Sequence, residues 1–582
     1  MYVIATAGHV DHGKSTLVRA LTGSDPDRLA EEHRRGLSIE LGYAWTDLPS
    51  GRRLAFVDVP GHERFLGTML SGIGPVPAVL LVVSADEGWR RQTGEHVAAL
   101  AALDVRHGLL VVSRTDLADP KPAAEDALLR LADTPLSGLP WVGVSARTGT
   151  GLRELRAALD VLIAKLPAPP QVARTRLFVD RVFAARGAGT VVTGTLQAGA
   201  IQVGDRVEVA GMAATVRALE SCREPAPRVD AVARVAVNLR GVAHEQVHRG
   251  DAVLTPDAWS MTTAIDVSVL PPAETLPRTL ILHVGSAAIP VTPRLLAGAS
   301  GGFARLTLAR PLPLQPGDRG VLRDPGRHAV AAGVRVLDVD PPPLTQRGAA
   351  RRRAVQLAAG YGADQALSRY EAARRSDFAL LGWPDPADAQ VHGEWWVSAD
   401  AAARWQQALL RLVSDDRSGE RATGGPAAAT AAALLPDPQL LASIAAACGL
   451  VVHGGRLVPA ADGRPRLPPA VTTALDSLLS RLAEHPFAAP DAAELVGLGL
   501  DARARAVLAD AGLLLRLPGD VLLLPDAPAR AAALLRGLDA PFTLSQARQA
   551  LGTTRRVAVP LLEHLDRIRV TVRVDASSRR LR

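Results

Sequence analysis

The chain of 582 residues has little cysteine and no long apolar run. These two features argue against a disulfide-rich, zinc-cluster or membrane-spanning protein. Its two cysteines, Cys222 and Cys448, are too few for a disulfide framework or a zinc cluster, so we expect both to be small core residues. A membrane-spanning helix needs about 18 consecutive apolar residues, and neither such a run nor a charged-then-apolar leader is found. The sequence therefore predicts a cytoplasmic protein with no membrane partner.

Lysine is scarce as well, since Lys14, Lys121 and Lys165 are the only lysines among 66 basic side chains. The net charge of +7 favours a nucleic-acid partner, but an excess of Arg, Ala and Pro also follows from genome composition. Charge alone is therefore weak evidence of function. At about 150 residues per domain, the length predicts three to five domains.

Lys14 lies in a glycine-rich loop that predicts a nucleoside triphosphate site. The loop, residues 8–15, has the pattern G-x-x-x-x-G-K-S and joins the apolar run 2–5 to a helical pattern. In such a loop, backbone N–H groups and the helix dipole bind phosphates, Lys14 reaches the β- and γ-oxygens, and the Ser15 hydroxyl ligates Mg²⁺. A slender ammonium fits there where a guanidinium would not. The predicted nucleotide contacts of the loop are Asp11, His12, Gly13, Lys14, Ser15 and Thr16.

Residues 1–168 alternate apolar strands with amphipathic helices, which is typical of a doubly wound α/β domain. Asp58 and Gly61, in the sequence D-V-P-G-H, stand at the C-terminal end of one of the predicted strands. We expect the Asp58 carboxylate to hold Mg²⁺ through water and the Gly61 N–H to meet the γ-phosphate. Strands are predicted at residues 54–59, 78–83, 108–112 and 141–144.

Two later stretches favour guanine over adenine as the base. Ser113, Arg114 and Asp116 follow a predicted strand, and the Asp116 carboxylate can accept both N1–H and N2–H₂ of guanine. Ser145 and Ala146 follow the next strand, where a backbone N–H can donate to guanine O6. Asp116 as a mere helix N-cap is the alternative. The first domain is therefore predicted to be a P-loop GTPase domain.

Beyond a Pro-rich break at residues 166–170 the pattern changes twice. Short alternating strands predict two β-barrels, at residues 172–258 and 260–342. The remaining chain repeats two helices and short strands, which predicts an array of winged-helix domains joined by a flexible segment at residues 414–426. Four winged helices are predicted, at residues 345–415, 425–465, 468–537 and 538–582.

The last winged helix opens with a capping box at Thr543 and Gln546 and carries an arginine-rich face. We expect this face to bind RNA phosphates, and a solvated basic face on a protein-docking winged helix is the alternative. The arginines of this face are Arg555, Arg556, Arg567, Arg569, Arg573, Arg579, Arg580 and Arg582, with Arg555, Arg556, Arg569 and Arg573 as the main candidates.

With these motifs the first domain resembles the translational GTPases. Residues 35–39, R-G-L-S-I, are similar to the first switch of that family, which implies Ser38 as a Mg²⁺ ligand where the family usually has Thr. The resemblance also implies that His62 orients the attacking water once the ribosome positions it. Ser113 and Arg114 depart from the family's N-K-x-D or T-K-x-D pattern, so guanine affinity is expected to differ while Asp116 preserves specificity.

A GTPase domain and two β-barrels followed by four winged helices resemble the bacterial selenocysteine-specific elongation factors over essentially the whole chain, and residues 41–44 and 552–563 are also similar to that family. The resemblance implies a GTP- and Mg²⁺-dependent factor that delivers selenocysteyl-tRNA to the ribosome. It also implies that the last winged helix binds an mRNA hairpin beside an in-frame UGA codon. A general aminoacyl-tRNA carrier and a GTP-dependent RNA-binding regulator are the alternatives. We expect a monomer.

Asp180, Arg181 and Arg234 match the proposed amino-acid pocket of that family. A selenol is anionic at neutral pH, so a pocket that selects selenocysteine over serine needs fixed positive charge. Arg offers a permanent charge and a planar donor fork, while Asp180 can hold an Arg or accept from the α-amino group. Ordinary surface ion pairs at these arginines are the alternative.

Overall fold

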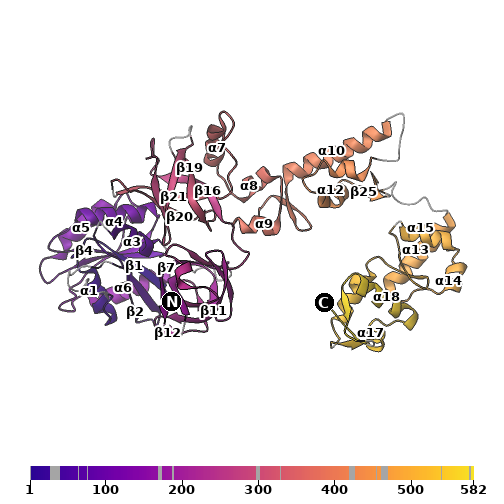
Figure 1. Ribbon diagram of the computed structural model, residues 1–582, viewed down its shortest axis with the longest axis horizontal. Coiled ribbons are helices and arrows are strands. Elements are labelled where there is room, and N and C mark those ends of the chain that lie inside the picture. The colour runs from indigo at the N-terminus through magenta and orange to yellow at the C-terminus, as the bar shows by residue number, and fades with distance from the viewer. Residues whose placement is uncertain are drawn as a thin grey trace. The chain divides into compact units, whose positions relative to one another are not determined.

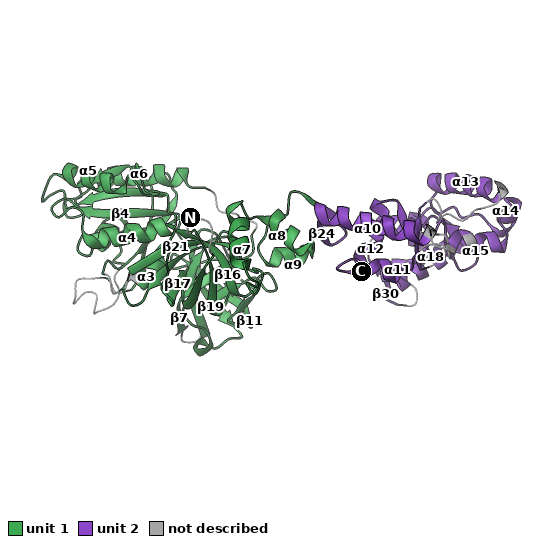
Figure 2. Ribbon diagram, turned by 90° about the horizontal axis from the view of Figure 1, so that it is seen from above, with its two compact units in different colours: residues 1–389 green, residues 390–582 purple. Residues whose placement is uncertain are grey.

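The computed structural model describes residues 2–581 except 27–37, 39, 63–64, 75, 168–172, 186–188, 297–301, 328, 419–425, 454, 461–468, 511, 539 and 576–577. The chain divides into two compact units, residues 1–389 and 390–582 (Figure 2). Within the described ranges, no helix combines the length and the apolar character that crossing a membrane requires.

Unit 1 begins with a six-stranded sheet in the order β2-β3-β1-β4-β5-β6 (Figure 1). Neighbouring strands pair in parallel except β2 and β3, which form an antiparallel pair. The four predicted strands are confirmed to within one residue at each end. The strands are β1 (Tyr2–Ala7), β2 (Gly42–Asp47), β3 (Arg53–Asp58), β4 (Ala78–Ser84), β5 (His107–Ser113) and β6 (Trp141–Gly143).

Helices cover both faces of this sheet, which explains why its central strands are apolar without alternation. In β1, Val3 faces one apolar cluster and Ile4 faces another on the opposite side. The first cluster includes α3 (Leu66–Ile73), α4 (Arg91–Ala102) and α5 (Pro120–Leu131), and the second includes α1 (Lys14–Thr22) and α6 (Leu152–Lys165). The predicted site loops consequently meet at the carboxyl edge of the sheet.

Two closed six-stranded barrels follow, as the alternating patterns predict. In the first barrel, pairing of β10 with β11 closes the ring. The first barrel contains β7 (Arg176–Ala185), β8 (Gly189–Leu196), β10 (Arg206–Val209), β11 (Met212–Ser221), β14 (Ala233–Arg240) and β15 (Ala252–Leu254). The second contains β16 (Thr262–Leu270), β17 (Leu280–Val284), β18 (Ala287–Leu295), β19 (Phe303–Leu312), β20 (Arg319–Asp324) and β21 (Ala329–Asp338).

The second barrel packs against α4 of the first domain, and Gly333 in β21 allows the close approach. A Cβ at this position would overlap the backbone of Ala102 at the end of α4. Arg319 in β20 adds an ion pair to Asp104, with 2.6 Å between the charged atoms. The first domain and the barrels therefore form one packed body.

A buried ion network holds α7 (Ala349–Ala358) on the second barrel. Arg353 of α7 is 2% exposed and donates to Asp266 at 2.6 Å and to Asp338 at 2.5 Å. Both aspartates are fully buried, and Arg305 also donates to Asp266. Fully buried charges persist only when they are paired in this way.

We expect Arg353→Ala to lower the free energy of unfolding by about 3 kcal/mol, because it leaves Asp266 and Asp338 buried with fewer partners. Urea unfolding of the full chain measures this change. Arg352→Ala, at an exposed position of the same helix, is the matched control and should change stability by less than about 0.5 kcal/mol. Equal effects of the two substitutions would contradict the stabilising role of the network.

The remaining helices and strands alternate as the repeat pattern predicts, and strand pairs form where wings are expected in the last three copies. The four-domain count and the domain bounds stay predictions. Up to β26 the elements are α8 (Ala363–Tyr370), β22 (Ala372–Arg374), α9 (Arg375–Leu380), β23 (Ala389–His392), β24 (Trp395–Ser398), α10 (Ala399–Ser418), α11 (Ala428–Ala432), α12 (Leu441–Ala447), β25 (Leu450–His453) and β26 (Arg456–Pro459). Then follow α13 (Pro469–Glu484), α14 (Ala492–Gly497), α15 (Ala502–Asp510), β27 (Leu515–Leu517), β28 (Val521–Leu523), α16 (Ala527–Leu535), β29 (Phe542–Thr543), α17 (Leu544–Ala550), α18 (Arg555–Arg567), β30 (Thr571–Arg573) and β31 (Ser578–Leu581).

Three sequence-based expectations about this part of the chain need correction or extension. Of the segment 414–426, which was predicted to be flexible, the residues up to Ser418 are helical because they belong to α10, and residues 419–425 lie outside the described residues. The two cysteines are half-buried rather than core residues. One apolar cluster runs from α13 through α18, so the last two predicted winged helices share a continuous core.

Candidate functional site

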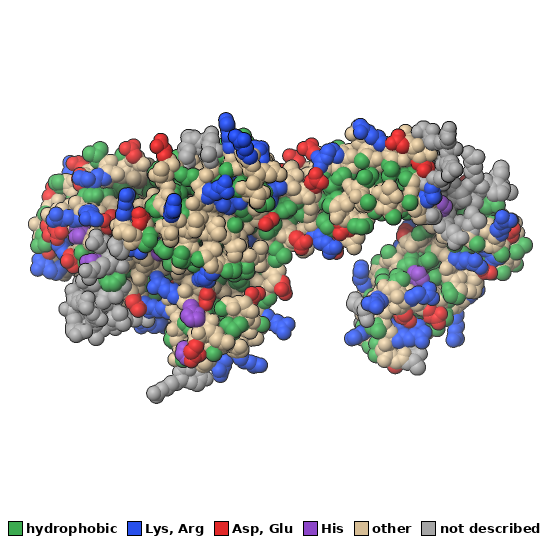
Figure 3. Space-filling model, turned by 45° about the horizontal axis from the view of Figure 1, so that its top comes forward, with side chains coloured by type: hydrophobic (Ala, Val, Ile, Leu, Met, Phe, Trp, Pro, Cys, Tyr) green, Lys and Arg blue, Asp and Glu red, His purple; other side chains and the backbone are tan. Residues whose placement is uncertain are grey.

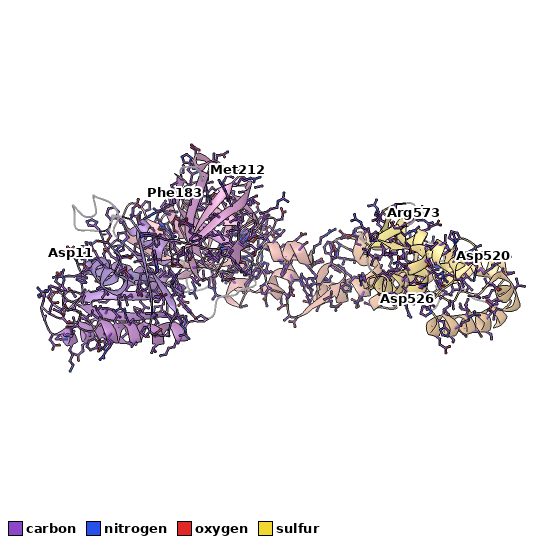
Figure 4. All side chains as sticks on the ribbon, turned by 90° about the horizontal axis from the view of Figure 1, so that it is seen from below. Asp11, Phe183, Met212, Asp520, Asp526 and Arg573 are labelled. Carbon is purple, nitrogen blue, oxygen red and sulfur yellow. The ribbon has the colours of Figure 1, made fainter. Side chains whose placement is uncertain are left out.

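The loop between β1 and α1 forms the floor of a cavity of about 660 Å³ at the carboxyl edge of the sheet. Asp11, which Figure 4 labels, and Gly13 both have left-handed backbone conformations that turn the loop inward. Most of the predicted nucleotide contacts line this cavity. They are Asp11, Gly13, Lys14, Ser15, Thr16, Gly61, Ser113, Arg114, Asp116 and Ala146, together with Ser38.

Lys14 and Gly61 occupy the phosphate end of the cavity. Lys14 Nζ donates to the carbonyl oxygen of His9 at 2.7 Å, which holds the ammonium over the loop. A Cβ at Gly61 would lie 2.6 Å from Lys14 Nζ and 2.6 Å from the Val10 nitrogen, so only glycine allows this approach. The backbone after Asp58 thus lies directly against the phosphate loop, where a γ-phosphate contact is possible.

Ser15, Ser38 and Asp58 bring three oxygen ligands together at the same end. Ser15 Oγ lies 2.6 Å from Asp58 Oδ2 and 2.9 Å from Ser38 Oγ. Thr6 Oγ1 donates to the other Asp58 oxygen at 2.6 Å and orients the buried carboxylate. Hydroxyl and carboxylate oxygens are the ligands that Mg²⁺ prefers, so these residues fit the ion. The other predicted first-switch residues, 35–37 and 39, lie outside the described residues.

Asp116 lies at the base end of the cavity. Its Oδ1 accepts from Ser145 Oγ at 2.6 Å, and its Oδ2 accepts from Arg147 Nε at 3.0 Å. The hydrogen bond from Ser145 holds the pKa of the Asp116 carboxyl below its ordinary value. An ionised Asp116 is the acceptor that guanine N1–H and N2–H₂ require. Arg147 was missed by the sequence analysis, because nothing in its surroundings in the sequence indicates a partner for Asp116.

Arg114 does not lie free above the base. It has a left-handed backbone conformation, donates to the carbonyl oxygen of Asp11, and is 3.1 Å from each of the carboxylates of Asp86 and Glu87. Ser113 Oγ similarly donates to the carbonyl oxygen of His12 at 2.7 Å. Ser113 and Arg114, which depart from the family pattern, therefore connect residues 113–116 to the phosphate loop.

Among the predicted nucleotide-site residues that the structure describes, His12, Asp58, His62 and Ser145 do not line the cavity. The His12 imidazole is fully buried, and burial lowers its pKa to about 4, so the side chain is a neutral packing group beneath the loop. The His62 ring is half-buried, with its centroid 6.0 Å from that of Phe65.

Comparisons with known proteins agree with this arrangement. Residues 1–165 match the model of the elongation factor Tu GTP binding domain. A selenocysteine-specific elongation factor of Escherichia coli (strain K12) is 36% identical over 453 residues, which cover 73% of this chain and 72% of that protein. The chain belongs to the selenocysteine-specific elongation factor family. Its first domain is accordingly a GTP-binding domain of the elongation factor Tu type.

Further matches extend along the chain. The beta-barrel domain of selenocysteine-specific elongation factors matches residues 263–343, and the winged helix of elongation factor SelB matches residues 533–580. A relative from Desulfomicrobium baculatum is 38% identical over 352 residues, and the match spans 58% of this chain but only about half, 55%, of that protein.

Solved structures of the family share the fold. The crystal structure of a bacterial selenocysteine-specific elongation factor, EF-Sec, covers 100% of this chain and 99% of its own, with a TM-score of 0.69 at 24% identity. The factor from Methanococcus maripaludis, solved with the GTP analogue GppNHp, covers 58% of this chain and 79% of its own, with a TM-score of 0.52 at 24% identity.

Asp180 and Arg234, two residues of the predicted amino-acid pocket, lie in the first barrel beside Tyr43 of β2. Arg234 donates two hydrogen bonds to Asp180, and both side chains are largely buried. The Arg234 guanidinium also stacks on the Tyr43 ring, 3.9 Å from its centroid. The Asp180–Arg234 pair is therefore not a surface ion pair, but the charge of Arg234 is already balanced by Asp180.

Arg181 is placed differently from Arg234. It is 31% exposed and contacts Glu40 at 2.9 Å and the carbonyl oxygen of Leu41 at 2.7 Å. With Arg234 and Arg223 it lines a cavity of about 210 Å³ whose remaining walls are mostly apolar and aromatic. Arg223 was missed by the sequence analysis, and its position after the strand β11 was the available signal.

The arginines of the last winged helix do not form one solvated face. Arg579 is buried and pairs with Asp566 at 3.0 Å, so its predicted place on this face is wrong. Arg556 is exposed, yet it donates to the carbonyl oxygens of Ala489 and Pro490 at 2.6 and 2.9 Å. Arg555 and Arg580 are exposed, and Arg582 lies outside the described residues.

Arg569 and Arg573 lie together beside the wing. They line a surface cavity of about 480 Å³ with Glu563, Asp566 and Arg567. Arg573, labelled in Figure 4, approaches Glu563 at 3.8 Å and Asp566 at 3.4 Å. Figure 3 shows acidic and basic side chains interspersed at this end of unit 2. The basic charge beside the wing is therefore partly balanced by Glu563 and Asp566.

Proposed function

We propose that this chain is a GTP-dependent elongation factor that delivers selenocysteyl-tRNA to the ribosome at in-frame UGA codons. The observation that carries the proposal is the match to the Escherichia coli factor along 73% of the chain. The guanine site, the two barrels and the terminal winged helix supply the parts that such a factor needs. We propose that this winged helix binds an mRNA hairpin, because tethering raises the local concentration of the complex at one codon.

In this proposal GTP occupies the cavity of the first domain. Lys14 and the loop N–H groups bind the β- and γ-phosphates, and Asp116 selects guanine. Ser15, Ser38 and Asp58 would hold Mg²⁺, which neutralises phosphate charge and orders the first switch when bound. His62 would orient the attacking water after the ribosome moves its segment toward the γ-phosphate.

The aminoacyl end of the tRNA is proposed to enter near Arg181, beside the Asp180–Arg234 pair. Arg181 would supply the positive charge for a selenolate, because its pair with Glu40 is exposed and more easily exchanged than the buried Asp180–Arg234 pair. Asp180 holds Arg234 in a fixed orientation through two hydrogen bonds. The Asp180–Arg234 pair would thus form a rigid wall of the amino-acid pocket, and Arg181 would be the group that binds the selenolate.

Protection of the ester bond tests this function. Hydrolysis of selenocysteyl-tRNA and of seryl-tRNA on the same tRNA is followed with protein and a non-hydrolysable GTP analogue. We expect the selenocysteyl ester alone to be protected, and Arg181→Ala to reduce that protection about tenfold while Arg206→Ala, at an exposed barrel position, leaves it unchanged. Equal protection of both esters would contradict the selective pocket. Protection of neither would favour an RNA-binding regulator.

A further inference from the structure

Asp86 and Glu87 follow β4, and both contact Arg114, while Glu87 also approaches the buried His12 at 3.8 Å. Neither acid lines the nucleotide cavity. A carboxylate oxygen of each acid lies 3.1 Å from Arg114 Nη1, so one guanidinium nitrogen is shared by two carboxylates. All three side chains are about 30% exposed, at 31% for Arg114, 28% for Asp86 and 30% for Glu87. Partial burial makes such charge-assisted hydrogen bonds stronger than surface pairs.

The other end of the same guanidinium binds the phosphate loop. Arg114 NH2 donates to the carbonyl oxygen of Asp11, at the position where the loop backbone is left-handed. The planar fork of Arg allows both ends to be held at once, which a lysine ammonium on a flexible stem does less rigidly. Arg114 therefore connects the turn after β4, which carries Asp86 and Glu87, to the phosphate loop at Asp11.

We propose that Asp86 and Glu87 are positioning residues for the guanine nucleotide, acting through Arg114 on the phosphate loop. The inference rests on the proposed function, since it concerns the same nucleotide site. It accounts for the arginine at position 114, where the family's N-K-x-D or T-K-x-D pattern has lysine, because the guanidinium can bind both carboxylates at once. The acid pair fixes Arg114, Arg114 fixes the Asp11 carbonyl, and the loop N–H groups keep their orientation toward the phosphates.

The direction of the change in nucleotide affinity on removal of the two acids distinguishes a positioning role from a purely electrostatic one. A nucleotide carries several negative charges, so removal of two nearby carboxylates should tighten its binding if they act only as charges. If they act by holding Arg114, their removal should weaken binding. The two explanations thus predict opposite shifts in the dissociation constant for GDP.

The test measures association and dissociation of a fluorescent GDP with the full chain. We expect Asp86→Asn combined with Glu87→Gln to raise the dissociation rate about tenfold, and each single substitution to give part of that effect. Glu125→Gln combined with Asp126→Asn is the matched control, because these neighbouring acids of α5 also pair with basic side chains, at 3.9 and 3.0 Å. The control should leave the rate unchanged.

A double-mutant cycle with Arg114→Ala identifies the route. In the Arg114→Ala background the acid substitutions should cause no further weakening, because the group through which they act is gone. Thermal unfolding without nucleotide verifies that the variants are folded. If Asp86→Asn combined with Glu87→Gln is not folded, the single substitutions are measured in its place. Arg114→Lys should retain part of the affinity.

Tighter GDP binding after removal of the acids would overturn the inference, and so would equal weakening in both backgrounds. Neither result would affect the proposed function, because the wild-type chain would still bind GDP. Failure of the wild-type chain to bind any guanine nucleotide would instead contradict the proposed function itself. The two failures are therefore distinguishable in one set of measurements.

Discussion

Asp116→Asn is expected to change the preferred base from guanine to xanthine and to weaken GTP binding about 10³-fold or more, because the side chain then lacks one of two acceptors. Asn offers one acceptor oxygen and one NH₂ donor. Xanthine has a carbonyl oxygen where guanine has its 2-amino group, so it can accept from the new donor. Ser145 Oγ, which donates to Asp116 at 2.6 Å, can still donate to the Asn oxygen and hold the side chain in place.

Competition of GTP and XTP with a fluorescent nucleotide measures this change. Asp119→Asn is the matched control, because Asp119 lies three residues further along and accepts from the Lys121 N–H at the start of α5. It should leave the preference for guanine intact. If Asp116→Asn binds GTP as tightly as the wild type, Asp116 is only a local structural residue and guanine selection must come from other groups.

His62→Ala is expected to reduce ribosome-stimulated GTP hydrolysis about 10²- to 10⁴-fold, the range that a positioned acid–base or water-orienting group supplies. Nucleotide binding should stay within about twofold of the wild type, since the His62 side chain does not line the cavity. Single-turnover hydrolysis with ribosomes and equilibrium binding without them measure the two quantities separately.

His107→Ala provides the control for loss of a histidine elsewhere in the same domain, at the start of β5. It should leave the hydrolysis rate unchanged. His62→Gln, which retains a hydrogen-bonding side chain, should recover part of the rate. A parallel loss of binding and hydrolysis in His62→Ala would contradict a role confined to the hydrolytic step and would indicate that His62 supports the fold of the site.

The residues of the nucleotide site could be predicted because each of them follows a strand of a parallel sheet. Such strands end at one edge, so Lys14, Asp58, Asp116 and Ala146 were expected to lie near one another, although the strand order itself came only from the structure. The contacts of Arg114 could not be predicted in the same way. Its two carboxylates come from the turn after β4, about 27 residues earlier in the chain, and no local pattern relates them.

The sequence by itself determined the GTP-binding domain and the two barrels, and it predicted the phosphate loop and the residue that selects guanine, because these follow from periodicity and from backbone and side-chain chemistry within short segments. The tertiary structure alone decided which charges are free and which are balanced. Arg234 is buried against Asp180, Arg579 against Asp566, and Arg353 against Asp266 and Asp338. The reason is physical: an ion pair depends on distances between segments far apart in the chain, and only folding sets those distances.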